Sequence, residues 1–561
     1  MRSATVSGFF TLIGIILMPL PTYSAVEKTI DTNSFTGAYL AGRIANYENK
    51  MNLAIHYFQQ ALIYEPNNLE TKKEIFQAML SVGAFTEAVQ QAKKLKEKDI
   101  ITPLISLTLS IENLIKKNYK EAQLLLQAKT SPPDNNPIFE LTNAWAKFGS
   151  GNQFQAITDL EKHLGPAWYN LFIHYHLALM SELAKRPQDA KKYFIQALNN
   201  QQGAITATDT YERVIIAYAS FQLRQNMRSD AIKTLRHGEK ILLGYETLKN
   251  IRQKVEKGAN IENLITTPQQ GIGEVLYNFG TTLNKRGSER IARIFQQFSL
   301  ALYPKNEATL FQLAKISAKL NDYNQAIKIY RALPSSSPYY RDGQFQLALT
   351  LAENGNHDEA IKLLTLLEKK FPNDRHIFIT LAAIYMQKNN FSEAIKILDQ
   401  AIAQITDFQR DNWRLFYQRG IAFNYLKQWP KAETDFRKAL TFFPDQPQVL
   451  NYLAYSLIDR DQKLEESLNM LKKAVTLQSQ NSYILDSLGW AYYKLKQYSQ
   501  AVTTLETAVR LQPSDPTLND HLGDAYWQVG RKREAVFQWN HAIDGEPDNP
   551  ERIKEKIKFG L

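Results

Sequence analysis

Residues 482–515 read SYILDSLGWAYYKLKQYSQAVTTLETAVRLQPSD, and the next 34 residues, 516–549, repeat the same order of large, small, aromatic and proline residues. When Ser482 and Pro516 are each counted as position 1, the same residue types stand at positions 8, 20 and 32 of both copies: Gly489, Ala501 and Pro513, then Gly523, Ala535 and Pro547. This part of the chain is therefore built from copies of one 34-residue unit.

An alanine at position 20 continues this unit along almost the whole chain. It recurs from Ala54 to Ala535 in thirteen of fourteen copies, and Ser467 stands in the remaining one. Most copies carry a second small residue twelve places earlier, at position 8. Small side chains at two points let two helices approach toward the short end of the roughly 8–10 Å range of interaxial distances. Each unit is therefore predicted to be a pair of crossing helices, A and B.

A turn and a stop signal delimit the two helices. Position 15 is often Gly or Asn, as at Gly530 and Asn389, which indicates a tight turn between helices A and B. Position 32 is proline in seven copies, and proline cannot continue a helix. The sequence thus predicts an all-α fold, an α-solenoid (superhelix) of about fourteen helix-turn-helix units.

This pattern resembles the tetratricopeptide repeat (TPR), whose period and residue order it matches over nearly all of residues 35–549. The resemblance implies a surface that binds other proteins, without naming a partner. Exported bacterial TPR proteins of this size, which the C-terminal half resembles, include adaptors that hold substrates for an envelope protease and factors in envelope assembly. Such adaptors are often lipoproteins, and this chain departs from them because it has no cysteine.

Interruptions of the repeat predict five segments. Residues 1–24 form a signal peptide, and residues 35–245 an N-terminal superhelix of divergent repeats. Residues 246–272 form an insert or hinge, residues 273–549 a C-terminal superhelix of better-formed repeats, and residues 550–561 a polar cap for the last one.

The first of these segments sets the expected location. It has a basic residue, Arg2, then the largely apolar run 9–18, and then Pro19. A run of about ten residues is too short to span a bilayer as a helix, so a secretory signal peptide and a periplasmic protein are expected. An inner-membrane anchor formed by an uncleaved signal is the alternative.

Composition and motifs argue against catalysis. The absence of cysteine excludes disulfides, thiolate metal sites and cysteine nucleophiles. No zinc-protease, phosphate-loop or serine-elbow motif occurs, so we expect no catalytic residue, no metal and no cofactor. A hydrolase or transferase activity in the divergent N-terminal half or the insert is the alternative function.

The charge balance bears on partners. The net charge of +11 comes partly from runs such as residues 93–96, which we interpret as solvated helix faces, with contact to an anionic membrane surface as the alternative. Nucleic acid is not an expected partner, since the chain has an export signal and an acidic groove.

A peptide-binding groove is predicted on helix A of the last four repeats. Positions 2, 5, 9 and 12 form a stripe about 130° from the positions that pack on helix B, and in this repeat family that stripe lines the concave groove. The predicted site residues are Arg414, Tyr417, Asn451, Tyr455, Tyr483, Asp486, Trp490, Tyr493, Asp520, Asp524 and Trp527.

Two interpretations of these residues remain open. Carboxamides and carboxylates can bond a peptide backbone, and rings can cover ligand side chains. The three aspartates make the groove acidic, which favours a ligand that carries Lys or Arg. Alternatively, the rings pack between neighbouring A helices.

Overall fold

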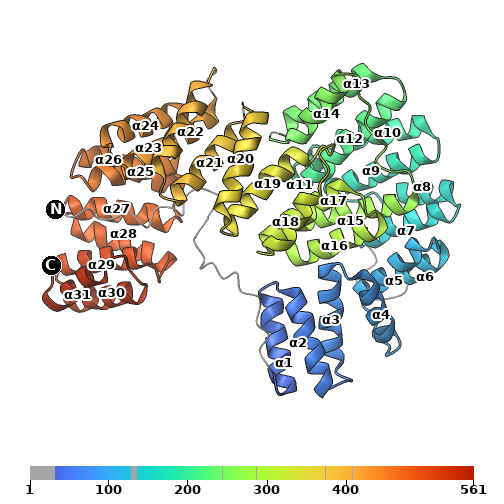
Figure 1. Ribbon diagram of the computed structural model, residues 1–561, viewed down its shortest axis with the longest axis horizontal. Coiled ribbons are helices and arrows are strands. Elements are labelled where there is room, and N and C mark those ends of the chain that lie inside the picture. Colours follow the sequence, from blue (N-terminus) through green and yellow to red (C-terminus); the bar gives the residue numbers. More distant parts are fainter. Residues whose placement is uncertain (1–31, 128–135, 243, 286, 373, 407–408) are drawn as a thin grey trace. The chain divides into compact units, whose positions relative to one another are not determined.

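The computed structural model describes residues 32–127, 136–242, 244–285, 287–372, 374–406 and 409–561, and their regular structure is helical throughout (Figure 1). The all-α prediction is confirmed. The predicted signal peptide lies outside the described residues. Among the described helices, none combines the length and the apolar character that a membrane span requires.

The helices of the first nine repeats are α1 (Phe35–Tyr47), α2 (Met51–Tyr64), α3 (Leu69–Val82), α4 (Phe85–Lys96), α5 (Pro103–Ile115), α6 (Tyr119–Gln127), α7 (Pro137–Gly149), α8 (Gln153–Glu161), α9 (Ala167–Leu183), α10 (Pro187–Leu198), α11 (Gln201–Thr206), α12 (Thr208–Arg224), α13 (Arg228–Ile241), α14 (Glu246–Glu256), α15 (Pro268–Lys285), α16 (Glu289–Leu302), α17 (Glu307–Lys319), α18 (Tyr323–Ala332), α19 (Tyr340–Glu353) and α20 (His357–Lys370).

The remaining helices are α21 (Arg375–Gln387), α22 (Phe391–Ala403), the 3₁₀ turn η2 (Arg410–Asn412), α23 (Trp413–Tyr425), α24 (Trp429–Phe442), α25 (Pro447–Ile458), α26 (Leu464–Leu477), α27 (Ser482–Lys494), α28 (Tyr498–Leu511), α29 (Pro516–Gln528), α30 (Lys532–Asp544) and α31 (Pro550–Phe559).

These helices form the fourteen predicted A–B pairs, with α11, α14, α31 and η2 outside the pairs. Each pair turns at position 15, where the backbone is left-handed in all fourteen copies, from Asn49 to Gly530. Side-chain caps fix the starts of several A helices. The Asn481 side chain accepts hydrogen bonds from the backbone amides of Tyr483 and Ile484, and Asp515 does the same one repeat later.

The small residues lie where helices A and B cross. The thirteen alanines at position 20 are fully buried, and in the copy that begins at Pro447 the buried small residue is Ser467, one place later. Gly489, at position 8 of its repeat, leaves little room for a side chain, since an added Cβ would lie 2.5 Å from Leu505 Cγ. The close crossing that the spacing predicted is therefore present.

The described chain divides into two compact units, an N-terminal unit that ends at Asn354 and a C-terminal unit that starts at Gly355. The sequence placed the joint at residues 246–272 instead. That segment belongs to the N-terminal unit: α14 packs on α13, and the Arg228 guanidinium donates to the carbonyls of Val255 and Ala259. It is a packed part of this unit rather than its boundary.

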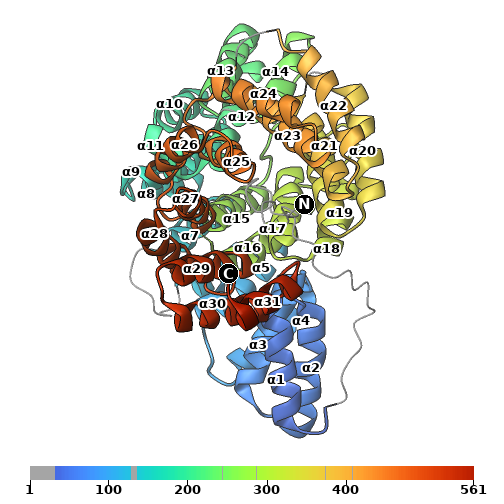
Figure 2. The ribbon, with the colours of Figure 1, turned by 90° about the vertical axis from the view of Figure 1, so that its left-hand side faces the viewer.

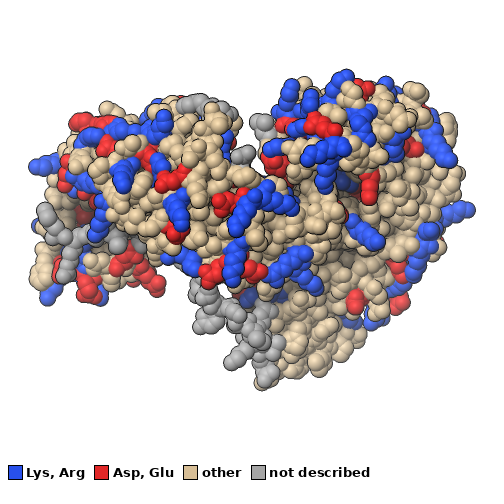
Figure 3. All heavy atoms as spheres, turned by 45° about the horizontal axis from the view of Figure 1, so that its top comes forward, with Lys and Arg blue, Asp and Glu red and all other residues tan. Residues whose placement is uncertain are grey.

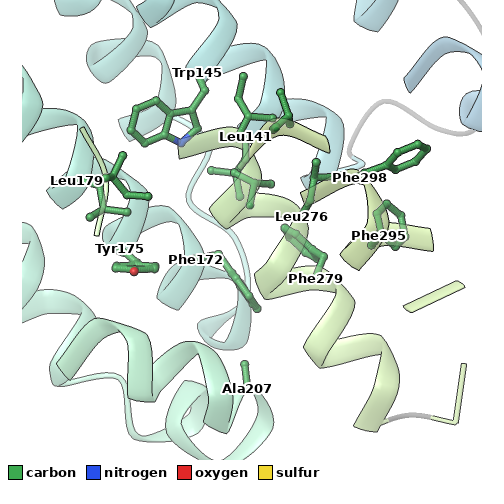
Figure 4. Packing of buried hydrophobic residues seen from close by; sticks show 14 of the residues in the cluster. Leu141, Trp145, Phe172, Tyr175, Leu179, Ala207, Leu276, Phe279, Phe295 and Phe298 are labelled. Carbon is green, nitrogen blue, oxygen red and sulfur yellow. The ribbon is translucent and has the colours of Figure 1, made fainter. Parts of the chain in front are cut away.

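The physical reason for the difference is the position of α15 and α16. These helices pack against α3, α5, α7, α9 and α12, so the N-terminal superhelix surrounds the repeat that was expected to start a second one. Phe279 of α15 stacks on Phe172 of α9 with 4.8 Å between ring centroids (Figure 4). One continuous core extends from Ala45 to Leu302.

A buried polar network also holds α15 in place. Arg213 of α12 donates two 2.8 Å hydrogen bonds to the Glu274 carboxylate of α15, and the Tyr175 hydroxyl donates a third at 3.0 Å. Trp145 Nε1 donates to His176 Nδ1 at 3.0 Å. Burial would raise the pKa of Glu274, but the Arg213 charge outweighs it and lowers that pKa. The carboxylate therefore stays ionised and fixes α15 against α9 and α12.

Candidate functional site

The inner faces of the two units differ. In the N-terminal unit the stripe at positions 2, 5, 9 and 12 is largely apolar and buried in several A helices: Leu107, Ile111 and Leu114 in α5, Leu141, Trp145 and Phe148 in α7, and Phe172, Tyr175 and Leu179 in α9. The stripes of α7 and α9 face α15 (Figure 4). This apolar stripe is the signal that sequence reasoning missed, since it marks an inner face that the chain itself fills.

Among the described residues of the C-terminal unit, no helix pair fills the inner face as α15 and α16 do in the N-terminal unit. The main contacts of α21, α23, α25, α27 and α29 are with helices that neighbour them along the chain. All eleven predicted site residues lie on α23, α25, α27 and α29. The structure therefore places the predicted residues on consecutive A helices of one unit, and their surroundings differ along it.

Trp490 and Tyr493 serve packing between helices. The Trp490 ring is stacked on Tyr493, 4.7 Å between centroids, and on His521 of α29, 4.2 Å between centroids. Tyr493 also meets Tyr498 edge-on. Trp490 thus packs between neighbouring A helices, as the alternative predicted, whereas Tyr493 contacts a ring of its own helix and Tyr498 of the B helix α28.

Asp486 of α27 pairs with the histidine of that stack. Its Oδ1 lies 2.8 Å from His521 Nδ1. Burial would lower the pKa of His521, but the neighbouring charge of Asp486 offsets it and raises that pKa. Asp486 is thus a partner of α29 and is itself buried.

Asp520 and Asp524 correct the prediction of an open acidic groove. Lys556 Nζ of α31 lies 2.6 Å from Asp520 Oδ1 and 2.6 Å from Asp524 Oδ1, and Arg552 Nη2 lies 2.6 Å from Asp520 Oδ2. Both carboxylates are buried. They are neutralised because α31 brings two cations against α29, which the repeat pattern alone does not show.

Trp527 is covered in the same way. Its ring packs against Trp539 at 5.5 Å between centroids, and the Lys532 ammonium lies 4.8 Å above it. At the end of α31, a Cβ on Gly560 would lie 2.0 Å from the Trp527 ring. The ring is therefore no free platform for a ligand.

The first part of the stripe is less occupied. Arg414 is exposed, with its guanidinium 5.0 Å from the Trp413 ring, whereas Tyr417 is buried edge-on against Tyr452. Tyr455 and Tyr483 are half-buried, and the Tyr483 hydroxyl accepts a hydrogen bond from Gln512.

Carboxamides between these residues lack hydrogen-bond partners. Both side-chain polar atoms of Asn451 are buried and unpaired, and so are the carbonyl oxygens of Gln418 and Gln448. Gln448 and Asn451 lie three residues apart, on one face of α25. A buried polar group without a partner costs about 1–3 kcal/mol, and a ligand that reached these buried atoms with both donors and acceptors would remove that cost.

The described part of the chain holds no group of three His, Cys, Asp or Glu side chains placed to bind a metal ion. Its charged residues are mixed in sign on the face shown in Figure 3. Lys93, from one of the basic runs, pairs with Glu112 at 2.8 Å.

Three family models of the tetratricopeptide repeat match this chain, over residues 311–375, 351–415 and 489–530. The chain contains tetratricopeptide repeats. TPR units are scaffolds for protein–protein interaction, and the matched residues include the whole of α21, α22, α28 and α29.

A curated TPR protein and several solved structures are similar to the chain. The TPR repeat-containing protein PA4667 of Pseudomonas aeruginosa is 29% identical over 102 residues, which are 18% of this chain and 17% of that protein. The match thus spans less than a fifth of that relative.

Among solved structures, the APC/C hetero-tetramer Cut9–Hcn1 is 14% identical, with a TM-score of 0.39 over 94% of this chain and 97% of that chain. YrrB, titled a TPR protein with an unusual peptide-binding site, is 18% identical, with a TM-score of 0.29 over 35% of this chain and 97% of that chain. A TPR protein of Parabacteroides merdae is 16% identical, with a TM-score of 0.36 over 45% of this chain and 97% of that chain.

Proposed function

We propose that this protein is an exported, non-enzymatic scaffold in the periplasm, and that it binds segments of envelope proteins along the inner face of its C-terminal unit. The observation that carries the proposal is the set of unpaired carboxamides on α23 and α25, beside the exposed Arg414. The matching face of the N-terminal unit is packed against α15 and α16.

The chemistry of these residues favours an extended peptide. A peptide backbone presents one donor and one acceptor per residue. In the proposed complex the Asn451 side chain, which is fully buried in this structure, is uncovered and pairs with both. Half-buried Tyr455, one turn further along α25, can cover a ligand side chain. The partner class that we propose is an envelope protease substrate or an assembly factor.

Asn451→Leu tests the site without damage to the fold. Leucine has a similar volume, and removal of an unpaired buried carboxamide should leave the melting temperature unchanged or raise it. We expect the variant to recover at least tenfold less of its partners from an envelope extract than the wild-type chain does. The matched control is Gln538→Leu, which removes an unpaired carboxamide oxygen on the B helix α30.

Equal recovery by Asn451→Leu and wild type would overturn the proposed site. The location is tested separately, by osmotic-shock fractionation and N-terminal sequencing of the full-length protein expressed in a Gram-negative host. A processed chain in the shock fluid supports export with cleavage, and an intact chain in the inner membrane supports the anchored alternative. A chain that remains in the cytosol contradicts both.

A further inference from the structure

The C-terminal helix α31 lies against α29 and α30 at the end of the C-terminal unit (Figures 1 and 2). We propose that α31 is a displaceable occupant of this end of the inner face, and that a basic helix of a partner protein takes its place. This inference rests on the proposed role of the C-terminal unit in binding proteins. It adds how that binding is regulated and which kind of helix binds at this end of the unit.

The acidic residues of α29 and the basic residues of α31 have the same spacing along their helices. Asp520 and Asp524 are four residues apart on α29, and Arg552 and Lys556 are four residues apart on α31. Residues at this spacing lie one above the other on one helix face. Lys556 contacts both aspartates, and Arg552 contacts Asp520. The site therefore selects two cations one helical turn apart.

Apolar packing holds α31 through two residues, buried Ile553 and half-buried Ile557, which join the core around Trp539. Of its ten residues only Ile553 and Lys556 are buried, whereas nine residues of α29 are buried. Phe559 at its end is 74% exposed. A helix of this length is marginal by itself, so its position depends on this small apolar contact and on the ion pairs. Such contacts can be exchanged for equivalent ones from another helix.

Two neighbours of the aspartates restrict further which helices can bind at this site. Trp539 Nε1 donates to Asp524 Oδ1 at 3.0 Å and fixes that carboxylate. Trp527 packs against Gly560, where no side chain fits. A replacement helix must therefore carry Arg or Lys, then Lys four residues later, then glycine after four more, which is the spacing of Arg552, Lys556 and Gly560.

A labelled peptide of residues 549–561 is the probe for this site. In the full wild-type chain the tethered α31 has an effective concentration on the order of millimolar, so micromolar peptide should not compete. In full-length Lys556→Gln the resident helix loses its main contacts, and the peptide should bind at least tenfold more tightly than it binds wild type. Lys554→Gln is the matched control, since Lys554 is exposed and pairs only within α31, and it should behave as wild type.

Two further measurements complete the test. Adding Asp520→Asn and Asp524→Asn to Lys556→Gln should abolish peptide binding. Backbone amides of residues 553–559 should exchange with deuterium at least tenfold faster in Lys556→Gln than in wild type. If Lys556→Gln does not fold, Arg552→Gln removes the more exposed contact and should give an intermediate gain in binding.

Slow exchange of α31 in Lys556→Gln, or no gain in peptide binding by either variant, would overturn the inference. In that case the proposed function would still be supported if the wild type recovers partners and Asn451→Leu does not. The failure of this inference is thus distinguishable from the failure of the proposed function.

Discussion

Gly523 shows how little room the helix crossing leaves. A Cβ at this residue would lie 2.4 Å from Trp539 Nε1. Trp539 is fully buried and bonded to Asp524, so it cannot move aside. In an exposed helix alanine is favoured over glycine by about 1 kcal/mol, whereas overpacking costs about 1–3 kcal/mol.

We therefore expect Gly523→Ala to lower the free energy of unfolding in urea, on balance by about 1–2 kcal/mol. Gly489→Ala should cost less, because its nearest neighbour is the flexible side chain of Leu505. A higher melting temperature for Gly523→Ala than for wild type would contradict this account of position 8.

Glu212 of α12 predicts a pH dependence in the N-terminal unit. Burial raises the pKa of this carboxyl to about 8, and the charge of Asp209 adds to this effect. Arg213 acts in the opposite direction, and Asp342 and Lys315 have smaller effects. The folded state therefore holds a proton that the unfolded state has released, and stability falls as pH rises from the ordinary pKa of Glu toward 8.

Glu212→Gln removes this proton linkage. Its stability relative to wild type should be greater at pH 9 than at pH 6, because only the wild type must then carry a buried charge. Urea unfolding of both proteins at the two pH values measures the difference. The same relative stability at both would show that Glu212 is not protonated in the folded state.

At the scale of elements, the pair Asp486–His521 joins α27 to α29. The pKa of His521 is raised, so its contribution to stability is complete below the unfolded pKa and is lost as pH rises through the folded pKa. Asp486→Asn leaves His521 buried without its nearest anion, and burial alone lowers the pKa of a histidine.

Titration of the His521 ring protons by NMR should therefore give a lower pKa in Asp486→Asn than in wild type. Glu506→Gln is the control, since Glu506 bonds Tyr526 and Arg531 instead. An unchanged His521 titration in Asp486→Asn would refute the assigned pair.

At the scale of the whole molecule, the division into two compact units predicts that a destabilising substitution in one unit lowers the stability of that unit alone. Glu274→Gln would leave Arg213 buried without its partner, which typically costs 3–5 kcal/mol. Because α15 belongs to the core of the N-terminal unit, the loss should be confined to that unit.

Hydrogen exchange followed by mass spectrometry can measure this confinement. Protection of α7, α9 and α15 should fall in Glu274→Gln, and protection of α27 and α29 should stay as in wild type. An equal loss in both units would mean that they unfold as one cooperative body.

The sequence alone predicted the repeat and its local geometry correctly. The left-handed turn at position 15 occurs in all fourteen copies, and each copy has a buried small residue at position 20 or, for Ser467, one place later. These features depend on contacts within one helix pair, so a 34-residue window contains all of their causes.

Only the tertiary structure decided which inner surfaces are occupied. Whether an inner residue is free depends on a helix outside its own A–B pair: α15 for Trp145, and α31 for Asp520 and Asp524. The apolar stripe of α7 indicated this burial in the sequence itself. The aspartates gave no such indication, because a carboxylate looks the same in sequence whether a lysine covers it or not.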